Sequence, residues 1–141
     1  MITILSGIPC SGKTTFRKKI MKLNPELYCL SLDDIRLEYP GKPENYVVEI
    51  FFNRLRFLLL NNKDVVLDNT FCKEKYIDKI FEDYKDINIQ IKFFKNSLIK
   101  SYILNVYRWL TTGKFVPFKV IKRMNINFKK INKHKYEKYM V

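Results

Sequence analysis

Short apolar runs alternate with longer segments in which apolar residues recur every three or four positions. The short runs predict strands at residues 2–6, 27–30, 64–68 and 88–95. The longer segments predict helices at residues 13–23, 43–62, 73–86, 97–110 and 117–131. Strands that alternate with helices indicate an α/β fold, in which a parallel sheet of about four or five strands carries helices on both faces.

The helix expected at residues 43–62 has the clearest apolar face. That face consists of Val47, Ile50, Phe51, Leu55, Leu58 and Leu59. A similar stripe, most consistent with a core contact, consists of Val120, Met124, Phe128 and Ile131. Pro117 precedes that stripe and favours a helix start, because its fixed φ suits a first helical position.

The first expected strand runs directly into Gly-Ile-Pro-Cys-Ser-Gly-Lys-Thr at residues 7–14. This G-x-x-x-x-G-K-T pattern between a strand and a helix is typical of a loop whose backbone N–H groups hold phosphates. Lys13 can reach the β- and γ-phosphates, and the Thr14 hydroxyl can ligate Mg²⁺. We therefore predict ATP and Mg²⁺ as cofactors. The expected phosphate-binding residues are Gly7, Pro9, Cys10, Ser11, Gly12, Lys13, Thr14 and Thr15.

Polar side chains follow two further expected strands. Asp33-Asp34-Ile35-Arg36 comes after the second strand, and Asp68-Asn69-Thr70 ends the third. The carboxyl ends of parallel strands share one edge of the sheet, so both segments should lie beside the phosphate loop. A carboxylate there can accept a proton from an attacking hydroxyl, and an arginine can hold a phosphate. The alternative for the first segment is an ordinary helix start, where Asp caps free N–H groups.

In this order, the motifs resemble the kinase domain of phage-type polynucleotide 5′-hydroxyl kinases, within a group of P-loop kinases that includes zeta-toxin-like enzymes. The segments that carry the resemblance are residues 7–14, 31–36 and 66–70, Arg108, and residues 116–124. The resemblance implies that Asp33 is the general base on the acceptor hydroxyl and that Arg36 holds the neighbouring phosphate. It also implies that Asp68, Asn69 and Thr70 form the acceptor pocket.

The resemblance further implies a lid at about residues 108–116, which usually carries two or more arginines that clamp the donor phosphates. Here Arg108 is the clear match, while Thr111 or Thr112 takes the second place and Lys114 is the candidate substitute. A lysine is a point charge without bidentate geometry, so we expect reduced turnover. Tyr102, Tyr107, Trp109 and Phe115 lie near this lid in sequence; base stacking and core packing both remain open for them. The phosphatase domain of some relatives has no counterpart, so no 3′-end removal is expected.

The net charge of +13 is concentrated in one part of the chain. Residues 1–91 hold 14 Lys and Arg against 13 Asp and Glu, whereas residues 92–141 hold 13 against Glu137 alone. Such an excess favours a polyanionic partner, although lysine-rich sequence drift is the alternative. The basic helix and tail at residues 117–141 should then follow a nucleic-acid backbone. The residues expected to do so are Lys119, Lys122, Arg123, Lys129, Lys130 and Lys133.

The composition points to one domain over residues 1–141, without a linker or repeat. No apolar run approaches the roughly 18 residues of a membrane span, and the N-terminus does not look like a signal peptide. Cys10, Cys29 and Cys72 lack metal-ligand spacing and are expected to be reduced thiols, so a cytoplasmic location is expected. The only histidine, His134, is expected at the surface.

These patterns predict an ATP-dependent phosphotransferase, with Lys13, Asp33 and Arg108 as its catalytic residues. The expected reaction transfers the γ-phosphate of ATP to a 5′-hydroxyl of DNA or RNA. Two alternatives remain open. One is a kinase for a nucleoside, a sugar derivative or an antibiotic, and the other is a nucleic-acid-binding switch with little turnover. The sequence leaves the oligomeric state undetermined.

Overall fold

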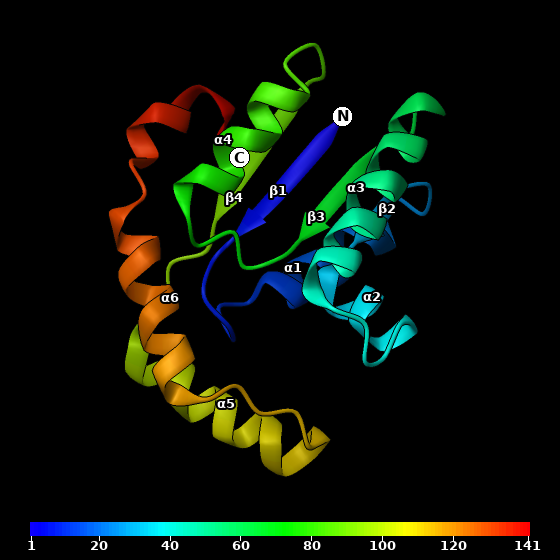
Figure 1. Ribbon diagram of the computed structural model, residues 1–141. Coiled ribbons are helices and arrows are strands. Elements are labelled where there is room, and N and C mark those ends of the chain that lie inside the picture. The colour runs from blue at the N-terminus through cyan, green and yellow to red at the C-terminus, as the bar shows by residue number, and fades with distance from the viewer.

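A computed structural model describes all residues, 1–141, and contains a four-stranded parallel sheet (Figure 1). The strands are β1 (Ile2–Ser6), β2 (Tyr28–Leu30), β3 (Val65–Asp68) and β4 (Ile89–Phe93), in the order β2-β3-β1-β4. In the centre, Ile4 of β1 lies opposite Leu67 of β3 and Ile91 of β4. The α/β fold class, with its parallel sheet, is therefore confirmed.

The helices fall close to the expected segments. They are α1 (Lys13–Leu23), α3 (Glu44–Leu60), α4 (Glu74–Asp83), α5 (Leu98–Thr112) and α6 (Phe118–Lys130). Two further elements were not predicted: the short helix α2 (Leu32–Glu38) and a C-terminal 3-10 helix, η1 (Lys133–Tyr139). None of the helices is long and apolar enough to cross a membrane.

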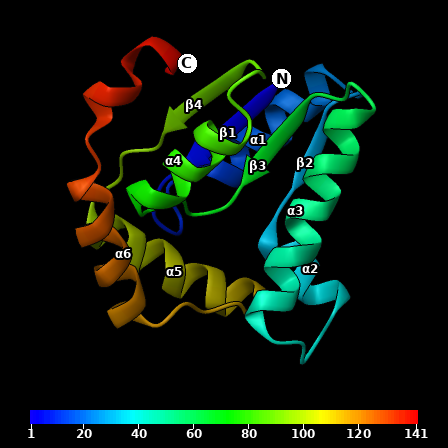
Figure 2. The same cartoon turned by 45° about the horizontal axis from the view of Figure 1, so that its top comes forward.

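Helices cover both faces of the sheet (Figure 2). The side chains of β1, which alternate between the two faces, show which helices pack on each face. Ile2 and Ile4 point into a large core that includes residues of α3 and α4. Leu5 instead belongs to a smaller cluster, where side chains of α1 cover the opposite face. Successive residues of a strand face opposite sides, so one buried strand serves both layers. The sheet thus carries helices on both faces, as expected.

Helix α2 begins at Leu32, in the segment for which an ordinary helix start was the alternative interpretation. The Ser31 side chain accepts a hydrogen bond from the backbone N–H of Asp34 at 3.4 Å, which is an N-cap contact. The Oδ1 atom of Asn69 accepts a second bond, from the N–H of Leu32 at 2.8 Å. The end of β3 therefore fixes the start of α2.

The C-terminal segment packs on the core, which corrects the expectation that Lys133 projects towards a nucleic acid. Lys133 donates to the carbonyl of Phe128 at 3.3 Å, and its Nζ lies 4.5 Å from the centre of the Phe128 ring. Tyr136 is buried, and its hydroxyl donates to Asp78 at 2.6 Å. Apolar burial and these polar contacts hold η1 against α4. Of the predicted basic residues, Lys119, Lys122, Arg123, Lys129 and Lys130 are exposed as expected.

Helices α5 and α6 form a hairpin that extends from one end of the sheet (Figures 1 and 2). Within α5, only Ser101 and Asn105 are buried. Asn105 makes two bonds to the connecting segment: its amide donates to the carbonyl of Val116 at 2.7 Å and accepts from the N–H of Val116 at 3.0 Å. This fully buried amide therefore fixes the segment that follows α5.

Candidate active site

The loop at residues 7–12 lies between β1 and α1, as the motif requires. Position 7 requires glycine because the neighbouring side chains lie too close for a Cβ atom. An added Cβ would lie 2.7 Å from the Ser11 hydroxyl and 2.9 Å from Phe94 Cβ. Gly12 has a φ of +94°, which is accessible to glycine at little cost. Cys10 has a φ of 60°, an uncommon conformation for a residue with a side chain. The tight, strained backbone is what a phosphate cradle needs.

Lys13 is buried at the start of α1, and its ammonium group lies against the loop. The Nζ atom donates to the carbonyls of Gly7 at 2.7 Å and Ile8 at 2.9 Å, and no carboxylate forms an ion pair with it. Burial lowers the pKa of Lys13 below its ordinary value, although the nearby Asp68 carboxylate acts in the opposite direction. A buried cation held by two carbonyl oxygens and, at 3.4 Å, by the Ser11 hydroxyl, without a paired carboxylate, is well placed to receive an anion.

The loop is joined to neighbouring strand ends by hydrogen bonds. The N–H of Gly7 donates to the carbonyl of Thr70 at 2.9 Å, which links the first glycine to the end of β3. The Asn96 amide donates to the carbonyl of Cys10 at 3.0 Å and to the Ser101 hydroxyl at 2.9 Å. Asn96 thus connects the loop to the first turn of α5.

Two predicted acceptor-side segments also meet here, through an arginine that the sequence analysis did not single out. Arg17 of α1 places Nη1 3.1 Å from a carboxylate oxygen of Asp68 and 3.5 Å from one of Asp34. Burial raises the pKa of the Asp68 carboxyl, and Arg17 and Lys13 offset only part of that rise. The edge of the sheet therefore combines one buried carboxylate with two cations.

Asp33 and Arg36 lie on the exposed side of α2. The Asp33 carboxylate is largely exposed and forms an ion pair with Arg36. The same guanidinium binds Glu44 at the start of α3, with Nε at 3.0 Å from Oε2. Hydrogen bonding to Glu44 is the main cause that raises the pKa of Arg36. Arg36, which was expected to hold a phosphate, is thus ion-paired with the carboxylates of Asp33 and Glu44.

Arg108 lies outside this group of residues. Its Nε is 3.5 Å from the carbonyl of Lys114, and its guanidinium forms no ion pair or hydrogen bond with the phosphate loop or with α2. Helix α5 extends to Thr112 and ends at Gly113, whose φ of +72° suits a left-handed cap. The predicted lid at residues 108–116 is therefore partly helical, with Thr111 and Thr112 inside α5.

The residues at the loop fit ATP and Mg²⁺. Lys13 and the strained backbone offer donors to phosphate, and the side chain of Thr14 is exposed at the first turn of α1. No cluster of three or more His, Cys, Asp or Glu side chains forms a protein cage for a metal ion. The exposed Thr14 hydroxyl is the kind of single protein ligand through which Mg²⁺ commonly binds, together with substrate phosphates.

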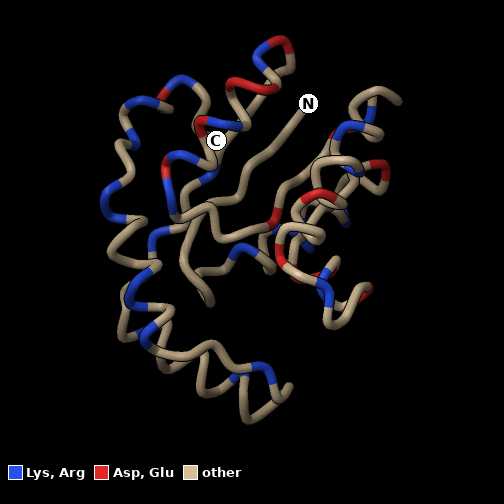
Figure 3. Tube along the Cα trace, in the orientation of Figure 1, with Lys and Arg blue, Asp and Glu red and all other residues tan.

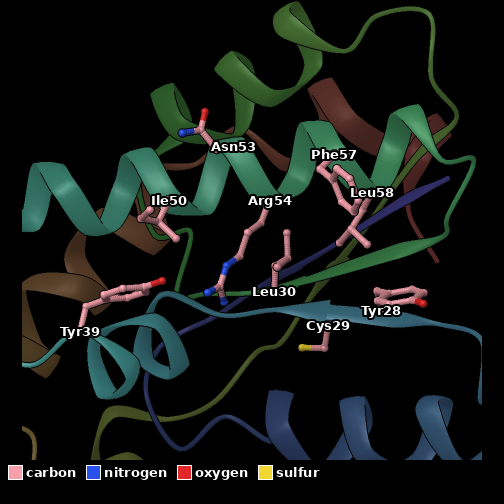
Figure 4. A pocket seen from close by; sticks show the side chains of 9 residues that line it. All are labelled: Tyr28, Cys29, Leu30, Tyr39, Ile50, Asn53, Arg54, Phe57 and Leu58. Carbon is pink, nitrogen blue, oxygen red and sulfur yellow. The ribbon is translucent and has the colours of Figure 1, made fainter.

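A cavity of about 450 Å³ lies elsewhere, between α3 and β2 (Figure 4). Its lining is mostly apolar and includes Leu30, Ile50 and Phe57, with no phosphate-loop residue. Its one charged residue, Arg54, is paired with Glu38. The cavity offers no free cation to a phosphate, so it is not the place of phosphoryl transfer.

Three polar residues of the site were missed in the sequence: Arg17, Glu44 and Asn96. Arg17 follows Lys13 by four positions, and this helical spacing was the available signal for a residue on the same side of α1. Glu44 and Asn96 carried no such signal. Glu44 contacts Arg36 across the turn between α2 and α3, and Asn96 contacts Cys10, which lies 86 positions earlier in the chain.

A parallel sheet in the order β2-β3-β1-β4, with a phosphate loop between β1 and α1, defines a P-loop protein of the kinase type. The model of the AAA_33 family, described as an AAA domain, matches residues 2–131 of the chain. The chain belongs to this family, and its sheet order and phosphate loop are those of the P-loop kinase group.

Solved structures share the fold. A chain of the Pnkp1/Rnl/Hen1 RNA repair complex matches at a TM-score of 0.84 with 24% identity, over 98% of this chain and 45% of its own length. A gluconokinase from Sinorhizobium meliloti 1021 matches at a TM-score of 0.63 with 16% identity, over 99% of this chain and 79% of the gluconokinase chain. A putative kinase from Chloroflexus aurantiacus j-10-fl matches at a TM-score of 0.65 with 13% identity, over 79% of this chain and 67% of the other chain. The chain thus spans less than half the length of the first of these relatives.

Proposed function

We propose that this protein is a polynucleotide 5′-hydroxyl kinase, which transfers the γ-phosphate of ATP to the 5′-hydroxyl of DNA or RNA with Mg²⁺. The observation that carries the proposal is the excess of positive charge in residues 92–141. Residues 92–141 carry 13 Lys and Arg against one acidic residue, and Figure 3 shows basic positions along α6 and the segment after it. A small neutral acceptor gives no reason for such a surface, whereas a polyanion does.

In the proposed reaction, Lys13 and the backbone N–H groups of the loop hold the donor phosphates. Thr14 supplies a ligand to Mg²⁺, which adds positive charge beside those phosphates. Asp33 accepts the proton of the acceptor hydroxyl as its oxygen bonds to the γ-phosphorus. The bond from that phosphorus to the β-phosphate oxygen breaks, and ADP leaves.

Five further residues, from the acceptor side and from the lid, have proposed roles in this reaction. Arg36 holds the phosphate next to the acceptor hydroxyl after exchanging its contact with Glu44, while Asp68, Asn69 and Thr70 shape the acceptor pocket. Arg108 approaches the donor phosphates when the hairpin of α5 and α6 moves towards the loop. Such an approach stabilises charge that develops during transfer.

A small-molecule kinase is the second candidate function. One observation favours it: Arg36 is already neutralised by Asp33 and Glu44, so the site can accept a hydroxyl compound that lacks a phosphate. The fold similarity to a gluconokinase is compatible with this candidate. A nucleic-acid-binding switch with little turnover is a third, supported by the single arginine of the lid.

The test is transfer of label from γ-³²P-ATP to 5′-hydroxyl oligonucleotides, 3′-mononucleotides, nucleosides and gluconate, with and without Mg²⁺. We expect Mg²⁺-dependent labelling of oligonucleotides and 3′-mononucleotides, but not of nucleosides or gluconate. The Lys13→Ala protein should lose this labelling by about 10²-fold or more, because a donor to developing charge is removed. Labelling of a small hydroxyl compound alone would support the second candidate. Bound ATP without any labelled acceptor would support the switch.

A further inference from the structure

An aromatic cluster occupies the end of the hairpin formed by α5 and α6. The rings of Trp109 and Phe115 have centres 6.1 Å apart, those of Phe115 and Phe118 5.5 Å, and those of Phe118 and Tyr102 4.7 Å. Trp109, Phe115 and Phe118 remain 52%, 44% and 43% exposed. Single exposed apolar residues are ordinary, but a contiguous group marks a binding surface.

The cluster is held in place by polar contacts to the backbone, two of them from the buried Asn105. Both hydrogen-bonding groups of the Asn105 amide bind the backbone of Val116, the residue that follows Phe115. The Tyr102 hydroxyl lies 3.4 Å from the carbonyl of Phe118. The aromatic rings therefore sit on a defined backbone, which reduces the entropy that binding a partner would cost.

The surroundings of the cluster are entirely basic. Residues 98–130 contain eight Lys and Arg and no Asp or Glu. Neither Lys114 nor Lys119, which adjoin Phe115 and Phe118 in the chain, forms an ion pair. A second copy of this chain would bring like charges together, whereas a polyanion with apolar faces matches both features. Single-stranded nucleic acid has this combination, because it pairs a charged backbone with flat bases.

We propose that Trp109, Phe115 and Phe118 form a stacking platform for the bases of single-stranded nucleic acid. The platform binds nucleotides beyond the 5′-terminal one, while Lys114 and Lys119 contact phosphates. The inference rests on the proposed function and extends it: the acceptor is single-stranded near its end and is several nucleotides long. Stacking on rings tolerates any base, so binding depends little on sequence.

The only tryptophan of the chain lies in this cluster, so tryptophan fluorescence, excited at a wavelength that the nine tyrosines do not absorb, reports on the platform alone. The full chain is titrated with a 5′-hydroxyl oligothymidylate of about ten nucleotides, an abasic oligomer of the same length, and ATP. We expect saturable quenching by oligothymidylate and none by the abasic oligomer or by ATP. Equal quenching by the abasic oligomer, or quenching by ATP alone, would overturn the proposal, since phosphate contacts or the donor base would then explain it.

The variant Phe115→Leu removes an aromatic ring but keeps an apolar side chain. Its matched control is Phe57→Leu, which alters an exposed phenylalanine of α3. Anisotropy of a labelled oligothymidylate should show binding weakened about fivefold or more by Phe115→Leu and unchanged by Phe57→Leu. Trp109→Leu is the second platform variant and should have the same effect. Equal affinities for all three variants would overturn the platform.

The two proposals fail separately. Quenching and variant effects without phosphoryl transfer would keep the platform and remove the kinase reaction on 5′-ends. Transfer to oligonucleotides without these effects would keep the reaction and overturn the platform. Light scattering tests whether a second copy of the chain covers this surface instead. Self-association of the wild-type chain that Phe115→Leu abolishes would show this and would overturn the proposal.

Discussion

Arg17 joins two carboxylates that belong to different strand ends: its Nη1 atom lies 3.1 Å from Asp68 and 3.5 Å from Asp34. Asp68 ends β3, whereas Asp34 lies in the first turn of α2 after β2. Lys13 and Arg17 occupy the same helix, α1, so this helix presents cations both to the phosphate loop and to the proposed acceptor side. One helix thereby sets the electrostatics of both halves of the site.

Arg17→Met should lower the free energy of unfolding by about 1–3 kcal/mol, because the Asp68 carboxylate would remain buried without its partner. This loss of stability is smaller than that for a fully buried ion pair, because the Arg17 side chain keeps some contact with solvent. Urea denaturation measures this change. Arg56→Met is the control, since Arg56 is exposed and forms no ion pair; it should alter stability by no more than about 0.5 kcal/mol. Equal losses in the two variants would contradict a structural role for the Arg17 contacts.

Asp33→Asn should reduce kcat about 10²–10⁴-fold if Asp33 removes the acceptor proton. The binding of ATP should change little, because Asp33 is an exposed residue of α2 rather than a part of the phosphate loop. Single-turnover transfer and ATP titration separate the two effects. Asp83→Asn, at the end of α4, is an exposed control that should leave both unchanged. An unaltered kcat in Asp33→Asn would exclude it as the general base.

Glu44→Gln should lower the KM for an oligonucleotide acceptor by about two- to fivefold, the size of an exposed ion pair. The reason is competition: Glu44 and an acceptor phosphate would bind the same guanidinium of Arg36. Arg36→Ala should raise that KM, so the two variants are expected to have opposite effects. Steady-state kinetics at fixed ATP provides the measurement. If both variants raised KM alike, Glu44 would be a support for the acceptor site rather than a competitor.

Tyr136→Phe should destabilise the protein by about 0.5–1.5 kcal/mol at neutral pH, the usual value of a hydrogen bond. The lost contact is the bond from the Tyr136 hydroxyl to Asp78. Partial burial disfavours the ionised form of Asp78, but the bonds from Lys135 and Tyr136 outweigh it and lower its pKa below the ordinary 3.8.

The stability that this bonding adds is therefore complete above pH 3.8 and is lost as the pH falls through the lower, folded-state pKa. The difference between wild type and Tyr136→Phe should shrink over that acidic range. Chemical denaturation at a series of pH values measures it, with Tyr107→Phe as an exposed control. A difference that does not change with pH would show that Asp78 ionisation is not coupled to this contact.

Much of the fold follows from local patterns in the sequence. The apolar face of α3 is a clear case: Val47, Phe51 and Leu55, which were expected to face the core, are buried. The phosphate loop was predictable as well, because Gly7, Gly12 and Lys13 act through backbone geometry that is set within a few residues. For α2, a helix start at residues 33–36 was only the alternative interpretation, and its N-cap residue, Ser31, was not recognised.

The sequence by itself determined the alternation of the four strands with five of the helices along the chain, the phosphate loop and the excess of positive charge, since each depends on residues that are close along the chain. Only the tertiary structure decided that Arg17 joins Asp34 to Asp68, that Glu44 occupies Arg36, and that η1 packs on α4. These contacts join residues that lie apart in sequence. The packing of the sheet brings them together, and local periodicity carries no information about such pairing.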